Sequence, residues 1–167
     1  LNLGWELSAK RILVLGAGGA VRGVLEPLLG QNPSELCIAN RTASKAEDLA
    51  RDFHDLGTVS GVSLEDLTGK QFDIVINGTS ASLHGALPPL PEHLLGPDAA
   101  CYDMMYAAEP TIFMRWATEH GATKVADGLG MLVGQAAESF YAWRHIRPEV
   151  VPVITQLRRK MSEGKSK

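Results

Sequence analysis

Residues 11–22 read RILVLGAGGAVR, and this stretch decides the fold. It begins as a short apolar run that ends at Leu15, as expected for a parallel strand buried on both faces. Gly16, Gly18 and Gly19 follow at once, so the chain can turn sharply and bring backbone N–H groups close to an anion. Residues 20–29 continue with a helical pattern whose N-terminus would point at that anion. The stretch therefore predicts a cradle for a pyrophosphate group.

The glycine turn by itself leaves two interpretations open. Clustered glycines also occur in many strand-to-helix turns, and the third position of the dinucleotide fingerprint is Val21 rather than Gly or Ala. The choice between a dinucleotide site and an ordinary turn therefore depends on the rest of the chain.

The composition predicts one ordinary soluble domain with a substantial core. The chain has 167 residues, of which 45% are hydrophobic and 21% charged. A net charge of −3 gives no reason to propose nucleic acid or an anionic membrane as a partner. No apolar run is long enough to span a membrane, and the start of the chain lacks the pattern of a signal peptide. We therefore expect a cytoplasmic protein.

Cysteine and histidine usage gives no sign of a metal site. Cys37 and Cys101 lie inside apolar runs, so we expect buried, reduced thiols rather than a disulfide or metal ligands. The histidines show no metal-ligand spacing, and we expect all of them on the surface: His54, His84, His93, His120 and His145.

Predicted strands and helices alternate along the chain with short connections. Strands are expected over residues 11–15, 35–40, 57–62, 73–77, 99–103 and 123–126, and helices over residues 20–30, 43–56, 111–121, 129–146 and 149–162. This pattern predicts an α/β fold, a Rossmann-like doubly wound parallel sheet of six strands in the order 3-2-1-4-5-6 with helices on both faces. Residues 80–97 carry four prolines and two glycines and predict a surface flap, and residues 162–167 predict a disordered tail.

The second expected strand ends in Asn40, Arg41 and Thr42, with Lys45 three residues further on. In a nicotinamide-binding domain of this order, an acid at this point takes the ribose 2′-hydroxyl, or a base takes a 2′-phosphate. No carboxylate is present here. Arg41 could bind phosphate oxygens through two N–H groups and stack on adenine, and Lys45 adds a second positive charge. This pattern favours NADP over NAD.

An ordinary helix start is the alternative interpretation of the same residues. Thr42 could be an N-cap, and Ser44 with Glu47 could form a capping box. That interpretation accounts for the hydroxyls, but not for two cations in a first turn, where the helix dipole disfavours them.

With Asn40-Arg41-Thr42 following the glycine turn, the chain resembles the shikimate dehydrogenase family. Asn77-Gly-Thr-Ser80 is similar to that family's segment after the fourth strand, and Tyr102-Asp-Met-Met-Tyr106 to the segment after the fifth. Asp127-Gly-Leu-Gly-Met131, with Gln135, resembles the start of the penultimate helix. The resemblance covers essentially the whole chain. It implies an oxidoreductase that uses NADPH to reduce 3-dehydroshikimate to shikimate in the biosynthesis of chorismate and the aromatic amino acids.

The resemblance also implies which residues bind the cofactor and the substrate. Positions that match the glycine turn hold the pyrophosphate, those beyond the second strand hold the adenosine phosphate, and those after the later strands approach the nicotinamide. The cofactor-binding residues would be Gly16, Ala17, Gly18, Gly19, Ala20, Asn40, Arg41, Thr42, Lys45, Thr79, Met104, Gly128 and Met131. Tyr106 and Gln135 would touch the shikimate.

Each of the later positions also has a structural interpretation. Met104 and Met131 could be plain core methionines, and Gln135 could be a hydrogen-bonded buried amide. Asp103 and Asp127 lie at strand ends, where we expect them to tie loops rather than to act as bases.

In this family a substrate domain that carries the catalytic Lys and Asp precedes the cofactor domain. Residues 1–167 contain no counterpart of it, so the chain looks like a cofactor domain that binds NADPH weakly and turns over nothing. The loss of a packed domain would leave an apolar face around Leu1, Leu3, Trp5 and the last two helices. That face could pair with another copy of the chain.

Three alternative functions stay open. A relative that uses quinate is close to the main interpretation. Glutamyl-tRNA reductase has an NADPH domain with a similar glycine turn and Asn-Arg-Thr segment, but it gives no reason for residues 102–106 and 127–135 as they stand here. A non-catalytic module that senses NADP or mediates assembly belongs to a different class.

Overall fold

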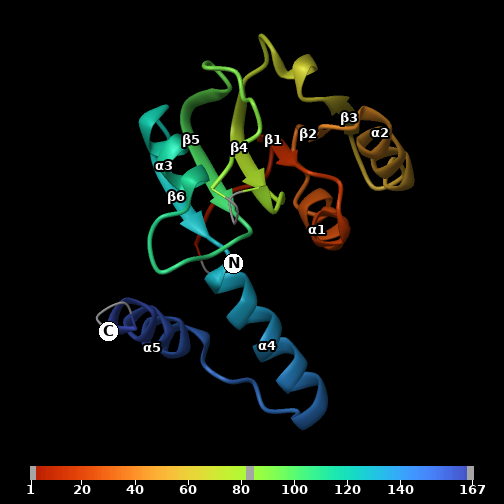
Figure 1. Ribbon diagram of the computed structural model, residues 1–167. Coiled ribbons are helices and arrows are strands. Elements are labelled where there is room, and N and C mark those ends of the chain that lie inside the picture. The colour runs from red at the N-terminus through yellow and green to blue at the C-terminus, as the bar shows by residue number, and fades with distance from the viewer. Residues whose placement is uncertain (1–2, 82–84, 165–167) are drawn as a thin grey trace.

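Six parallel strands form a single sheet in the order β3-β2-β1-β4-β5-β6. The computed structural model describes residues 3–81 and 85–164 (Figure 1). Its elements are β1 (Arg11–Leu15), α1 (Gly19–Leu29), β2 (Glu35–Asn40), α2 (Ala43–Asp52), β3 (Val59–Ser63), η1 (Glu65–Leu67), β4 (Phe72–Asn77), β5 (Leu95–Asp103), α3 (Ile112–Glu119), β6 (Lys124–Asp127), α4 (Leu129–Arg144) and α5 (Val150–Glu163). The predicted α/β class and strand order are confirmed.

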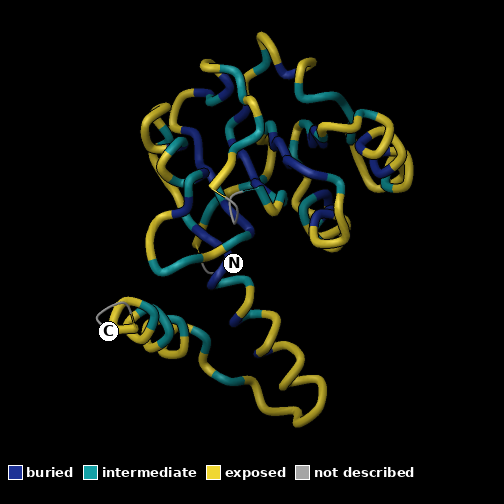
Figure 2. Tube along the Cα trace, in the orientation of Figure 1, coloured by how far each residue is buried: buried dark blue, intermediate teal, exposed yellow. Residues whose placement is uncertain are grey.

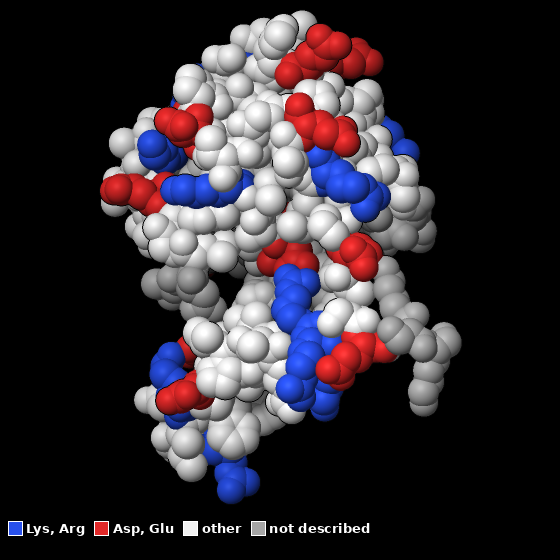
Figure 3. Space-filling view, turned by 90° about the vertical axis from the view of Figure 1, so that its left-hand side faces the viewer, with Lys and Arg blue, Asp and Glu red and all other residues white. Residues whose placement is uncertain are grey.

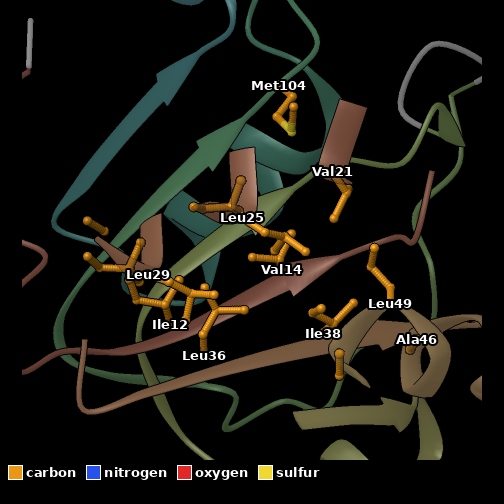
Figure 4. Close-up of a cluster of buried hydrophobic side chains, with 14 residues drawn as sticks. Ile12, Val14, Val21, Leu25, Leu29, Leu36, Ile38, Ala46, Leu49 and Met104 are labelled. Carbon is orange, nitrogen blue, oxygen red and sulfur yellow. The ribbon is translucent and has the colours of Figure 1, made fainter. Parts of the chain in front are cut away.

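Strand β1 lies at the centre of the sheet and is covered on both faces. Ile12 and Val14 belong to a core cluster with residues of α1 and α2, which Figure 4 shows between the sheet and these two helices. Leu13 and Leu15 belong to a second cluster, under η1, α3 and the segment before β5. All four side chains are fully buried. This double burial explains why the strand is a continuous apolar run rather than an alternating one.

The connection between β4 and β5 departs from the prediction. Residues 82–84 lie outside the described part of the chain, but Leu94 is fully buried in the second cluster, so the end of this segment is no surface flap. Strand β5 begins at Leu95 rather than at residue 99, because Leu95 pairs with Phe72 before the register shifts. Asp98, with φ of 57°, lies within this irregularity.

Helix ends also differ from the prediction by one to four residues, most of all at the end of α2. Helix α2 ends at Asp52, and the following residues make turn-type hydrogen bonds such as Phe53 N to Ala50 O. The run from Asp52 to Asp55 contains only weak helix formers, which accounts for the early end. Helix α5 continues to Glu163, so residues 162 and 163 do not belong to a disordered tail, and residues 165–167 lie outside the described part.

The last two helices extend away from the sheet. Helix α4 leaves the carboxyl end of β6, and its buried residues all lie within its first nine: Leu129, Val133 and Ala137. Helix α5 contains no buried residue, and both α5 and the far half of α4 are mostly exposed (Figures 1 and 2). Among the described residues, no helix is long and apolar enough to cross a membrane.

Candidate functional site

The glycine turn opens a stretch of bare backbone at the carboxyl end of β1. Gly16 has φ of +103°, which favours glycine, and its N–H donates to the Ala39 carbonyl at 2.8 Å. Gly18 is the N-cap of α1, and a Cβ built on Gly18 or Gly19 would meet nothing within 4 Å. The N–H groups of a first helical turn have no acceptor within the helix. An anion could therefore approach this turn closely.

The residues beyond β2 lie at the same edge of the sheet, since the parallel strands all end there. Arg41, Thr42 and Lys45 are exposed. Thr42 is the N-cap of α2, but its side chain makes no capping hydrogen bond; instead the Asn40 amide donates to the Thr42 carbonyl at 3.0 Å. The Thr42 hydroxyl therefore stays available to a ligand, and the capping-box interpretation gains no support.

Arg41 and Lys45 are two exposed cations at the start of α2. In the described part of the chain, no hydrogen bond or ion pair engages either side chain, whereas Arg22 and Arg51 are bound to Asp52 and Asp48. Arg41 directly precedes Thr42, the N-cap of α2, and Lys45 lies in the first turn of this helix, so both residues lie at its start. The arrangement leaves both charges free to bind a phosphate group.

A buried polar network holds together the other half of the edge. The Asn77 side chain accepts from Thr79 N at 3.1 Å and Thr79 Oγ1 at 2.7 Å, and donates to Asp103 Oδ1 at 3.0 Å. Asp103 also accepts from Met105 N at 3.0 Å and from Thr111 Oγ1 at 2.6 Å. The network fixes Thr79 and the residues after β5, and the prediction that Asp103 ties loops is confirmed.

Two glycines allow the segments of this edge to approach one another. A Cβ on Gly78 would lie 2.3 Å from Val21 Cγ2, and one on Gly128 would lie 2.0 Å from the Met104 carbonyl oxygen. The Gly128 N–H donates to Met105 O at 3.0 Å. Gly78 and Asn77 were missed as site-forming residues, although a glycine directly after a buried strand is a known sign of close backbone approach.

The turn between β6 and α4 is fixed by Asp127. Its buried carboxylate accepts from Leu129 N at 3.2 Å and is paired with Arg158 of α5, so it ties a loop as predicted. Burial raises the pKa of Tyr102 to about 12, and the Asp127 carboxylate acts in the same direction. Tyr102 therefore remains a neutral phenol at neutral pH. The sequence offered no sign of Arg158.

The two residues expected at a substrate line different cavities. Tyr106 is 40% exposed and lines a cavity of about 240 Å³ beside Thr111 and Arg115. Gln135 is exposed on α4 and lines a separate cavity of about 1410 Å³, which it shares with Met131. Met104 is buried, whereas Met131 is half-buried against the first core cluster.

The remaining predicted side chains behave as expected where the structure describes them. Cys37 and Cys101 are free and buried, and burial raises the pKa of the Cys101 thiol to about 12. The histidines at positions 54, 93, 120 and 145 are exposed, and position 84 lies outside the described residues. Within the described ranges, no group of three or more His, Cys, Asp or Glu residues could hold a metal ion.

Comparisons with known proteins agree on one family. The family described as shikimate / quinate 5-dehydrogenase matches residues 2–85, and the shikimate 5'-dehydrogenase C-terminal domain matches residues 128–158. A shikimate dehydrogenase (NADP(+)) of Cellvibrio japonicus is 66% identical over 164 residues, which are 98% of this chain and 59% of that protein. The enzyme of the same name from Thioalkalivibrio sulfidiphilus is 59% identical over 94% of this chain and 58% of its own length.

Among solved structures, an Ael1 enzyme from Pseudomonas putida is 51% identical, with a TM-score of 0.86 over 93% of this chain and 57% of that one. The chain thus spans about three fifths of the length of these relatives.

Proposed function

This chain belongs to the shikimate/quinate 5-dehydrogenase family, and from that premise we propose that it is the NADP-binding part of an enzyme that reduces 3-dehydroshikimate to shikimate. The relatives that are named NADP(+)-dependent shikimate dehydrogenases support this assignment. When bound, the nicotinamide supplies hydride exchange with the substrate carbon. The residues of this chain bind the cofactor and orient it.

The observation that carries the proposal is a pair of exposed cations, Arg41 and Lys45, whose side chains have no partner within residues 3–81 and 85–164. A 2′-phosphate distinguishes NADP from NAD, and a free guanidinium beside an ammonium is suited to bind it. The exposed Thr42 hydroxyl adds a donor at the same place. Figure 3 shows charges of both signs over one face of the molecule, with a group of Lys and Arg side chains on its lower part beside acidic side chains.

The other half of the cofactor would lie across the turn at Gly16 and the network around Asn77. The open N–H groups at Gly18 and Gly19 would hold the pyrophosphate. Thr79, Met104, Gly128 and Met131 would form the wall against the nicotinamide, because they follow β4, β5 and β6 at the same edge of the sheet.

A titration of this chain with NADPH and with NADH tests the cofactor assignment. We expect NADPH to bind at least about tenfold more tightly, because one charge-assisted hydrogen bond contributes roughly 1.5–3 kcal/mol. Nucleotide fluorescence or calorimetry would measure both dissociation constants. Equal affinities for the two nucleotides would contradict the assignment of the phosphate site.

We also propose that these 167 residues bind the cofactor without catalysing the reaction. The family's catalytic Lys and Asp lie in a domain with no counterpart in residues 1–167, and Tyr106 and Gln135 would supply only part of the substrate contacts. A coupled NADPH assay with 3-dehydroshikimate should show no turnover. Normal turnover by these residues alone would refute the proposal.

The alternatives differ in how far the observations support them. A quinate-using enzyme shares the family and the site, so a comparison of quinate with shikimate as substrates of the intact protein separates the two. The family match argues against a glutamyl-tRNA reductase domain. A non-catalytic NADP-binding module would show nucleotide binding but no substrate turnover even in the intact protein. A cytoplasmic location and pairing with a second copy complete the proposal.

A further inference from the structure

The side chain of Arg158 connects the last helix, α5, to the carboxyl edge of the sheet. Helix α5 otherwise packs on α4, where Ile154 lies 3.9 Å from a Cβ built on Gly130. The Arg158 guanidinium donates from one side to the Ala107 carbonyl at 3.1 Å, and from the other it pairs with the Asp127 carboxylate. One side chain of α5 thus binds the segment after β5 and the end of β6 at the same time.

The two segments that Arg158 joins carry the proposed nicotinamide wall. Met104 lies three residues before Ala107, and Gly128 directly follows Asp127. These segments are already in close contact, because the Gly128 N–H donates to Met105 O at 3.0 Å. The Asp127 side chain is only 4% exposed, so its charge depends on Arg158 and on the Leu129 N–H for compensation.

We infer that Arg158 is a positioning residue for the nicotinamide half of the site, an inference that rests on the proposed function. From α5, a helix outside the sheet, its side chain keeps the segment that carries Met104 at a fixed distance from the segment that carries Gly128. It has no contact with the adenosine half, since Arg41 and Lys45 lie beyond β2, on the other side of β1 and β4 from β6. Loss of Arg158 should therefore weaken binding of the nicotinamide half and leave the 2′-phosphate half unchanged.

Two nucleotides allow the binding of these two halves to be measured separately. NADPH carries both, whereas adenosine 2′,5′-bisphosphate carries the 2′-phosphate without the nicotinamide. In the intact protein, Arg158→Met should raise the dissociation constant of NADPH roughly tenfold, because a displaced wall would cost the bound nicotinamide half about one hydrogen bond's worth of contact. The dissociation constant of the bisphosphate should not change. Arg159→Met is the matched control, because Arg159 is exposed and, among the described residues, its side chain is paired only with Glu163, at 3.5 Å. Arg158→Lys should recover part of the loss.

Amide hydrogen exchange provides a readout without nucleotide. The Gly128 and Leu129 amides, which donate to Met105 O and Asp127 Oδ1, should exchange faster in Arg158→Met than in Arg159→Met. Equal losses for NADPH and the bisphosphate, or no loss for either, would overturn the positioning role even if the melting temperature falls. If the unmodified protein bound neither nucleotide, the proposed function would fail and the positioning role with it.

Discussion

Arg41 provides the most selective single-residue test of the cofactor site. Because its guanidinium has no partner among the described residues, Arg41→Ala removes a ligand contact without breaking an internal one. We expect NADPH to bind about 10- to 100-fold more weakly and NADH to be unaffected, since NADH has no 2′-phosphate. Fluorescence titration measures both. Arg51→Ala on α2, the helix that follows Arg41, is the control, because Arg51 is exposed and bound to Asp48. Equal losses for both nucleotides would rule out the phosphate role of Arg41.

Gly128 tests the close packing that forms the nicotinamide wall. Gly128→Ala would place a methyl group 2.0 Å from the Met104 carbonyl oxygen, and backbone on both sides prevents an easy shift. We expect a loss of about 1–3 kcal/mol in the free energy of unfolding, measured by urea denaturation. Gly23→Ala, in open space inside α1, should instead gain roughly 0.5–1 kcal/mol. Similar effects of the two substitutions would show that the close approach at Gly128 is absent.

At the scale of elements, the Arg11–Asp73 pair joins the starts of β1 and β4. The Arg11 side chain donates to Asp73 at 2.8 and 3.2 Å, and these hydrogen bonds lower the pKa of the Asp73 carboxyl. The folded state therefore binds a proton on Asp73 less readily than the unfolded state. The stabilisation is fully present above the unfolded pKa of about 4 and is lost as the pH falls through the folded value.

Asp73→Asn should accordingly destabilise the protein at neutral pH, and the difference from the unmodified protein should shrink below about pH 4. Urea denaturation across a pH series measures this difference. Asp48→Asn serves as the control, because Asp48 and Arg51 are both about 70% exposed and such surface pairs contribute little. A difference that stayed constant down to low pH would contradict the role of the Asp73 carboxylate.

The same elements show what the sequence can and cannot predict. The bounds of β1 and β2 were predicted to the residue, because each strand is a continuous apolar run that ends in Gly16 or Asn40. The start of β5 was not, because Gly96, Pro97 and Asp98 look like loop residues and only the pairing of Leu95 with Phe72 places them in the sheet.

In the candidate site, too, features set by neighbouring residues could be predicted, whereas contacts between distant residues could not. The sequence predicts the phosphate-binding role of Arg41 and Lys45, because that role depends only on nearby residues, at the end of β2 and the start of α2. The Asn77–Asp103 and Arg158–Asp127 contacts join residues 26 and 31 positions apart. Nothing local to either partner predicts those contacts, since both depend on the order of the strands and on where α5 lies.

At the scale of the whole molecule, the sheet body and the last two helices differ in how much apolar surface they leave open. The body buries its central strands β1, β2 and β4 on both faces. In contrast, Trp143 is 80% exposed at the end of α4, and Ile146 and Val151 are 62% and 68% exposed just after it. At the other end of the chain, Trp5 is not part of a bare face, because its ring packs edge-on against Tyr102. The open surface therefore centres on the connection between α4 and α5.

This exposed surface predicts that the 167-residue chain associates with a second copy as its concentration rises, because apolar side chains gathered at one place favour burial against one another. Sedimentation velocity over a concentration series should show the sedimentation coefficient increasing. Trp143→Glu combined with Val151→Glu should keep the chain monomeric. Leu56→Glu is the matched control, since Leu56 is 47% exposed on the sheet body after α2. A strict monomer at high concentration, or an equal effect of Leu56→Glu, would show that the α4–α5 surface does not drive association.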